Sequence, residues 1–141
     1  MALLETYITF KGNCAEALRF YERTLGGKIE MMLTFADAPD ANQYPPEAGK
    51  QIMHASLVID GHRLMASDAM PGQPYEGMTG FSLSLGHDTA AEAKKAFDAL
   101  GAGGQVTMPL QETFWAESFG MLIDRFGTPW MLSGGPKDFQ P

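Results

Sequence analysis

The sequence contains one cysteine, few basic residues and no long apolar run. Cys14 stands alone among 141 residues, which excludes an intrachain disulfide and a cysteine-rich zinc site. Ten Lys and Arg residues accompany 17 Asp and Glu residues, so the chain lacks the basic surplus with which nucleic-acid and anionic-membrane binders neutralise phosphates. No apolar run approaches the roughly 20 residues that span a bilayer, and the first residues carry no signal-peptide pattern. We therefore expect a cytoplasmic protein that binds neither nucleic acid nor membrane.

Glycine (16 residues) and proline (9 residues) separate many short apolar segments along the chain, beginning in its first half. Leu4 to Phe10 alternates in polarity, as a half-buried strand does. Asn13 and Glu16 form a capping pair that predicts a helix over 14–25, ended by glycine at 26 and 27. The next segments are a strand over 28–36, a mobile, lid-like loop over 37–50, and strands over 52–59 and 63–67 that flank a hairpin turn at 60–61.

The second half repeats this order with an offset of 76 residues. Thr89 and Glu92 form a second capping pair ahead of a helix that ends at Gly101. The strands expected around it are 81–85, 106–111, 119–124 and 130–133. We therefore predict an α+β fold in one domain, built from two βαβββ modules at 1–70 and 79–135 with a linker at 71–78. Each module forms an open, curled half-sheet that has a helix on one face and a concavity on the other.

Several segments resemble one known family. They are Tyr7 to Cys14, Phe20-Tyr21, His54-Ala55, Leu64 to Pro71, Gln111 to Ala116 and Asp124 to Trp130. Through them the chain resembles the PhnB-like family of the vicinal-oxygen-chelate superfamily, which includes glyoxalase I, bleomycin-resistance proteins and extradiol dioxygenases. The resemblance covers nearly the whole chain. It implies a ligand cleft between the modules, and together with exposed sheet edges it implies a homodimer.

The resemblance also implies where a divalent metal would bind. In metal-dependent members the ligands lie on the first, fourth, fifth and eighth strands, and these positions fall here near Glu5, Met65, Gly80 and Met131. Only Glu5 offers an oxygen ligand, so we expect no tightly bound metal, although weak binding of a divalent ion through Glu5 stays open. Members of this family also carry a ubiquinone-pathway methyltransferase label. No Gly-rich loop between a strand and a helix supports that label in this sequence.

Three residues are candidates for acid/base chemistry. His54 begins a strand and is either a general base or ligand contact, or a hydrogen-bonded histidine at a strand end. Asp68 is either a carboxylate at the cleft rim or a turn residue that caps backbone amides. Glu112 stands beside Phe114 and Trp115, where desolvation would raise its pKa, unless the aromatic side chains instead cover a barrel end or a dimer interface.

Strand parity predicts the residues that line the cleft. Leu4, Ile8 and Phe10 should face the helix, which places the alternate side chains in the concavity. The predicted lining is Glu5, Tyr7, His54, Met65, Ser67, Trp115 and Met131, with Asp68 and Glu112 at the rim. Two functions remain open: a small-molecule binding protein, for which the net charge of −7 favours cationic ligands, and a lyase-, isomerase- or dioxygenase-like enzyme that uses His54 and nearby carboxylates.

Overall fold

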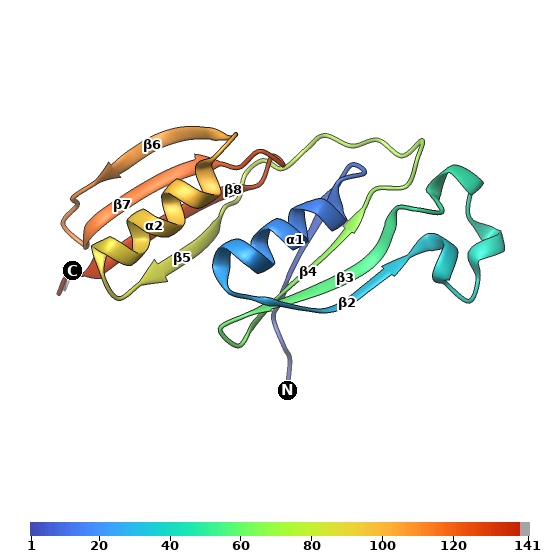
Figure 1. Ribbon diagram of the computed structural model, residues 1–141, viewed down its shortest axis with the longest axis horizontal. Helices are drawn as coiled ribbons and strands as arrows, with labels where there is room; N and C mark the ends of the chain where they lie inside the picture. The colour runs from blue at the N-terminus through green and yellow to red at the C-terminus, as the bar shows by residue number, and fades with distance from the viewer. Residues whose placement is uncertain (139–141) are drawn as a thin grey trace. The chain divides into compact units, whose positions relative to one another are not determined.

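A computed structural model describes residues 1–138 of the chain (Figure 1). The chain divides into two compact units, the first over residues 1–77 and the second from Met78 onward. Each unit contains one α-helix and one four-stranded mixed sheet. No helix in the described part of the chain is long and apolar enough to cross a membrane.

The first unit has the element order predicted from the sequence. Its elements are β1 (Thr6–Phe10), α1 (Cys14–Leu25), β2 (Lys28–Thr34), β3 (Ile52–Ile59) and β4 (His62–Asp68). The strands lie in the order β1-β4-β3-β2, in which β1 and β4 are parallel and the other neighbours are antiparallel. Helix α1 lies against one face of this sheet (Figure 1). The opposite face is not covered by any helix of the unit.

The second unit repeats the same topology. Its elements are β5 (Leu83–His87), α2 (Ala90–Gly101), β6 (Gln105–Gln111), β7 (Ala116–Ile123) and β8 (Pro129–Pro136). The strand order β5-β8-β7-β6 matches the first sheet strand for strand, again with one parallel pair at β5 and β8. The predicted α+β fold with two βαβββ modules is therefore confirmed.

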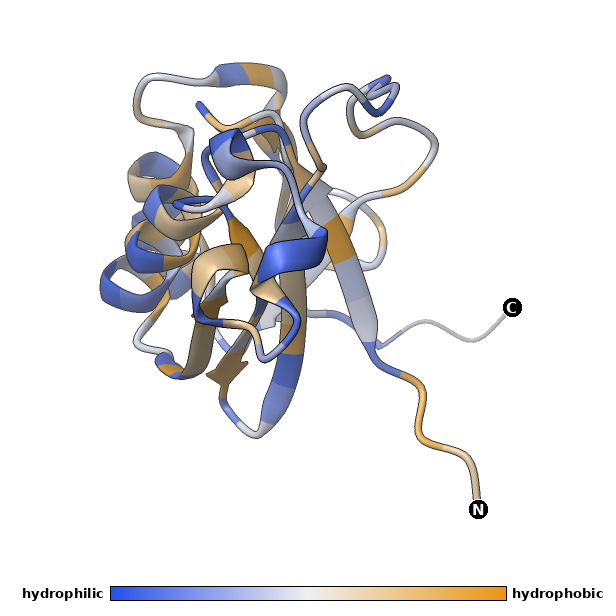
Figure 2. Ribbon diagram, turned by 90° about the vertical axis from the view of Figure 1, so that its right-hand side faces the viewer, coloured by the Kyte–Doolittle hydropathy of each residue, from blue (hydrophilic) through white to orange (hydrophobic). Residues whose placement is uncertain are grey.

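Alternating burial shows which face of each strand packs against its helix. In β1, Ile8 and Phe10 are buried, and in β4, Leu64 and Ala66 are buried. Residue Leu4 was expected on this face, but it precedes β1 and is 98% exposed. The apolar segment before β1 runs away from the sheet in Figure 2. The first strand is thus two residues shorter than predicted, because Leu4 and Glu5 have no partner in the β1 to β4 ladder.

The two predicted helix caps differ in outcome. Thr89 caps α2 as expected, because its hydroxyl accepts from the Glu92 amide at 3.1 Å and donates to the Glu92 carboxylate at 2.9 Å. Asn13 precedes α1, but its side chain makes no capping hydrogen bond, so the predicted Asn13 and Glu16 pair is wrong. At the other end of α1, Gly26 has φ 73°, a left-handed conformation that glycine adopts without steric cost.

Two other segments differ from the expected local structure. The strand predicted over 28–36 ends at Thr34, and three short 3-10 helices follow it in place of a plain loop: Phe35–Asp37, Ala41–Gln43 and Pro46–Ala48. The first of these is closed by a reciprocal capping box between Thr34 and Asp37. In the second unit, β7 and β8 extend beyond the predicted strands to Ala116 and Pro136, because backbone pairing continues through glycines at 134 and 135 that carry no strand signal.

Candidate functional site

The face of the first sheet opposite α1 collects most of the predicted site residues. We call it the open face; it is defined by the side chains of β1, β3 and β4 that alternate with the buried ones, together with Glu5 before β1 and Glu30 of β2, which bond to Arg63. Cross-strand pairing places Tyr7 beside Met65, and Met65 opposite Ser56. Ser67 lies on the same face, beside Thr9 on β1. Strand parity, which can be read from sequence, therefore placed Tyr7, Met65 and Ser67 together correctly.

Tyr7 and His54 form a pair across the open face. The Tyr7 hydroxyl lies 3.2 Å from Nδ1 of His54, and the two rings stack with centroids 5.6 Å apart and an interplanar angle of 27°. They come from strands β1 and β3, which flank β4. Tyr7 is 47% exposed and His54 is half-buried, so the pair combines aromatic surface with a polar nitrogen that a ligand can reach.

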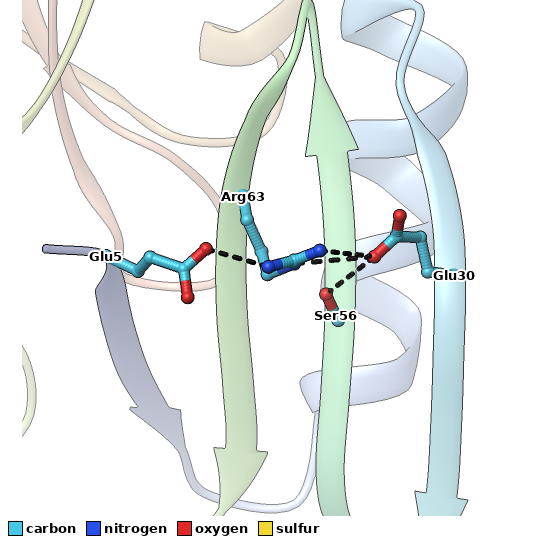
Figure 3. A network of polar contacts seen from close by, with 4 residues as sticks. All are labelled: Glu5, Glu30, Ser56 and Arg63. Atoms are coloured by element: carbon cyan, nitrogen blue, oxygen red, sulfur yellow. Dashed lines mark hydrogen bonds and ion pairs between the residues drawn. The ribbon is translucent and has the colours of Figure 1, made fainter. Parts of the chain in front are cut away.

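A charged network occupies the other end of the open face (Figure 3). Arg63 donates to Glu5 at 2.9 Å, and through Nε and Nη2 to a single oxygen of Glu30 at 3.4 and 3.3 Å. The Ser56 hydroxyl donates to the same Glu30 oxygen at 3.4 Å. The hydrogen bond and charge of Glu5, followed by the charge of Glu30, raise the pKa of Arg63, which stays a cation between two carboxylates.

Arg63, Glu30 and Ser56 were not predicted from the sequence as parts of this network. Arg63 precedes the first apolar residue of β4. A charged residue at this position indicates only an exposed end of the hairpin. Glu30 lies at an irregular step of the β2 to β3 pairing, between Ile29 and Met31, where simple alternation fails. The β1 to β4 pairing, which brings Glu5 beside Arg63, follows from topology rather than from local pattern.

The donor set of the first sheet does not fit the divalent metal that the fold family implies. Glu5 is the only oxygen ligand expected there, and its carboxylate is already paired with the Arg63 cation. Met65, at the second implied position, offers a thioether that suits soft metals rather than Zn²⁺, Mn²⁺ or Mg²⁺. Among residues 1–138, no group of three His, Cys, Asp or Glu side chains is arranged to hold a metal ion.

In the second sheet the position implied for the fifth strand needs correction. Gly80 precedes β5, which begins at Leu83, so it is not a strand residue. The register instead places Ser84 of β5 beside Met131 of β8. Met131 is half-buried between buried Trp130 and Leu132, which confirms its predicted parity. Neither Ser84 nor Met131 is an ordinary ligand of a hard divalent cation.

Asp68 is a structural carboxylate and does not lie at a rim. It is 4% exposed, and its oxygens accept hydrogen bonds from the amides of Gly12, Cys14 and Ile52, each at 2.9 Å. It thereby joins the end of β4 to the start of α1 and the start of β3. The expectation of a carboxylate at the cleft rim is wrong, because the Asp68 side chain points into the protein. The alternative expectation, a residue that caps backbone amides, is the correct one.

Glu112 also departs from its predicted electrostatics. It follows β6 and is exposed, and its carboxylate accepts a short hydrogen bond from Lys137 Nζ. This hydrogen bond and the charge of Lys137 lower the pKa of Glu112, whereas the sequence analysis expected desolvation to raise it. Lys137 is distant in sequence and carries no motif, so its pairing could not be read locally. Glu112 is therefore a poor candidate for a general acid.

Trp115 belongs to an aromatic cluster of the second unit. Its ring lies 4.7 Å from that of Phe114 and 5.3 Å from that of Phe119, both in edge-to-face geometry. Trp115 is 40% exposed and Phe114 is more exposed still, so the cluster is a surface feature rather than part of the core. The backbone carbonyl of Trp115 accepts from the Lys137 amide at 3.0 Å, which fixes the loop before β7.

Comparison with known proteins gives a family for this chain. The model of the Glyoxalase/Bleomycin resistance protein/Dioxygenase superfamily matches residues 4–132. Protein YjdN of Escherichia coli (strain K12) is 40% identical over 138 residues, covering 92% of this chain and 93% of that protein. Protein PA1353 from Pseudomonas aeruginosa has a crystal structure with TM-score 0.88 and 48% identity, covering 95% of this chain and 98% of that chain.

Similarity to a third protein supports the fold only. It is a Bacillus cereus protein described as a putative 3-demethylubiquinone-9 3-methyltransferase, PhnB protein, with TM-score 0.78 and 22% identity. The match covers 94% of this chain and 99% of that chain. Similarity to the PhnB-like architecture, expected from the sequence motifs, is therefore confirmed at the level of the fold.

Proposed function

The chain belongs to the Glyoxalase/Bleomycin resistance protein/Dioxygenase superfamily, and from this premise we propose that it binds a small molecule on the open face of its first sheet. The observation that carries the proposal is the Tyr7 and His54 pair: an exposed aromatic ring stacked on an imidazole, next to the half-buried thioether of Met65. Ligand sites commonly combine such apolar surface with a few polar groups. The formal net charge of −7 disfavours anionic ligands, so the ligand is neutral or cationic.

A thermal-shift screen of neutral and cationic aromatic compounds tests this proposal. A compound that binds the native state raises the melting temperature by mass action. Tyr7→Ala should weaken a hit about tenfold, the equivalent of roughly 1.4 kcal/mol of lost aromatic contact. Phe81→Ala, which removes an exposed aromatic side chain outside the first sheet, is the matched control. Equal affinity of the two variants would exclude the open face as the binding site.

We propose Trp115 as a second ligand-binding surface, within the second unit. Its exposed edge-to-face cluster offers a platform on which a planar or cationic group can stack. Trp115→Ala should weaken binding of a screened ligand while it barely changes the stability of the fold, because the ring is not in the core. If the variant unfolds, and its native fraction keeps full affinity, Trp115 has a packing role instead.

The proposal includes function without a resident divalent metal. The support is the set of possible ligand atoms. The Glu5 carboxylate is paired with Arg63, and Met65 offers only a thioether. Elemental analysis of purified protein should find far less than one equivalent of zinc, nickel, manganese or iron. A stoichiometric metal that is lost in Glu5→Gln would overturn this part of the proposal and make metal-dependent chemistry the leading function.

A second candidate function is metal-independent acid/base catalysis by His54. The specific observation behind it is the Tyr7 hydrogen bond to Nδ1, which orients the imidazole on the open face. The nearby carboxylates that the sequence suggested as partners do not support it, because Asp68 is engaged by three amides and Glu112 by Lys137. Conversion of a screened ligand that His54→Gln abolishes would favour catalysis over simple binding.

We also propose that the protein is a homodimer. Several large apolar side chains of the described residues are exposed, and each is apolar surface that a partner can cover. They include Leu3, Leu4, Met31, Val106 and Phe114. Burial of such side chains against a second copy would remove apolar surface from water.

A further inference from the structure

Three polar side chains form one row across the open face of the first sheet. The ladder sets Thr9 beside Ser67, and the β3 to β4 register, continued one residue past the Ala55 and Ala66 pair, sets Ser67 opposite His54. Strands lie about 4.8 Å apart, so the row spans about 10 Å. Within residues 1–138, the hydroxyls of Thr9 and Ser67 and Nε2 of His54 have no hydrogen-bond partner. We call these three residues the polar row.

The Tyr7 hydroxyl determines what His54 offers to a ligand. A neutral phenol is a good hydrogen-bond donor, and an unprotonated imidazole nitrogen is a good acceptor. The 3.2 Å contact fits an O–H donation from Tyr7 to Nδ1, which would place the imidazole proton on Nε2. With this tautomer, the polar row presents an N–H donor and two hydroxyls, which can also donate.

We infer that the polar row binds the carbonyl oxygen of an uncharged or cationic ligand whose apolar body lies over Tyr7 and Met65. This inference rests on the proposed function and names the ligand's polar group. Donors on adjacent strands, about 4.8 Å apart, can share one acceptor atom placed between them, as the donors of oxyanion-binding sites do, and Ser67 has such a neighbour on each side. The apolar pair of Tyr7 and Met65 lies next to the Thr9 and Ser67 pair on the same face, two residues earlier along β1 and β4.

The charges around the polar row favour a carbonyl over a carboxylate. The charged network at the end of the open face consists of Glu5, Arg63 and Glu30, whose sum is one negative charge. Tyr75, whose hydroxyl donates to the Thr9 carbonyl at 2.7 Å, stays protonated because burial, with Asp68 adding to it, raises its pKa. The row thus contains donors but no cation, and it would stabilise a neutral acceptor without attracting an anion.

The tautomer of His54 is the first test, and it needs no ligand. A long-range ¹H–¹⁵N spectrum of the imidazole distinguishes a proton on Nε2 from one on Nδ1. The wild type should show the Nε2–H form, and Tyr7→Phe should shift the population toward a mixture. A wild-type spectrum with the proton on Nδ1, or one that Tyr7→Phe leaves unchanged, overturns the role of Tyr7 as the residue that positions His54.

The second test uses three probes that share a benzene ring: acetophenone, 1-phenylethylammonium and benzoate. Backbone NMR titrations should show acetophenone shifting the open face most strongly and benzoate least. Ser67→Ala and Thr9→Val should each weaken acetophenone binding about three- to tenfold, the range expected for one lost hydrogen bond. Thr6→Val is the matched control, because Thr6 lies on the opposite face of β1 from Thr9. It pairs with buried Leu64.

The outcomes separate the inference from the proposed function. If the ammonium or benzoate shifts the open face as strongly as acetophenone, the carbonyl assignment is wrong and small-molecule binding stands. If Thr9→Val and Ser67→Ala bind acetophenone like Thr6→Val, the polar row is not the acceptor site. If none of the three probes shifts the open face, both the inference and the proposed function fail.

Discussion

Asp68 satisfies the start of α1, a role that the sequence assigned to Asn13. Its carboxylate accepts from the Cys14 amide at the first helical position and from the Gly12 amide just before it. The same side chain accepts from Ile52 at the start of β3, two residues before His54. One buried carboxylate therefore connects three segments that are distant in sequence. A negative charge at a helix N-terminus also interacts favourably with the helix dipole.

Replacing Asp68 should destabilise the fold strongly. Asp68→Ala leaves three amides without their acceptor, and hydrogen bonds to a charged group contribute about 1.5–3 kcal/mol each before the surroundings relax. We expect a loss of about 3 kcal/mol in the free energy of unfolding, measured by chemical denaturation. Glu76→Ala, at an exposed position of the same unit, is the control. A loss no larger than that of the control would show that Asp68 is dispensable.

Cys14 should be chemically silent in the native protein. Its place at the first turn of α1 suggests a lowered thiol pKa, but burial, together with the charge of Asp68, raises the pKa of Cys14 to about 12. The thiolate is the reactive form, so its population near neutral pH is very small. We expect no reaction with a disulfide reagent in buffer, and one reactive thiol per chain in denaturant. Rapid modification of the folded protein would contradict the buried position.

The secondary structure elements were largely predictable because their periodicity is local. The helix over 14–25 and the strand over 52–59 have the predicted bounds. Parity also placed Tyr7, Met65 and Ser67 on one face. What failed depends on partners distant in sequence: Lys137 lowers the pKa of Glu112, and Asp68 replaces Asn13 as the cap of α1. No local pattern encodes these contacts.

The two helix starts provide a matched pair of variants. Thr89→Ala removes a side chain that accepts from the Glu92 amide at 3.1 Å, and it should cost about 1 kcal/mol of stability. Asn13→Ala removes a side chain with no capping bond, and it should change the free energy of unfolding by only a few tenths of a kcal/mol. Urea denaturation of both variants would measure the difference. Equal losses would mean that Asn13 caps α1 in solution.

At the scale of the whole molecule, one plan is used twice with different side chains. Both sheets have the same strand order and the same parallel pair. The first open face carries the Tyr7 and His54 pair and the Arg63 network, whereas the equivalent positions beside Met131 include Ser84. The two units thus share one scaffold, and the side chains on the open faces of their sheets differ.

The homodimer is the prediction that belongs to this scale. Leu4 is 98% exposed and Phe114 63% exposed, and burying apolar side chains contributes about 25 cal/mol for each Å² removed from water. Sedimentation velocity at micromolar concentration should give twice the 15.3 kDa mass of the chain. Because apolar contacts are not screened by salt, the dimer should persist at molar salt, whereas an association through exposed charges would weaken. A species of 15.3 kDa under both conditions would show that the exposed apolar side chains serve another purpose.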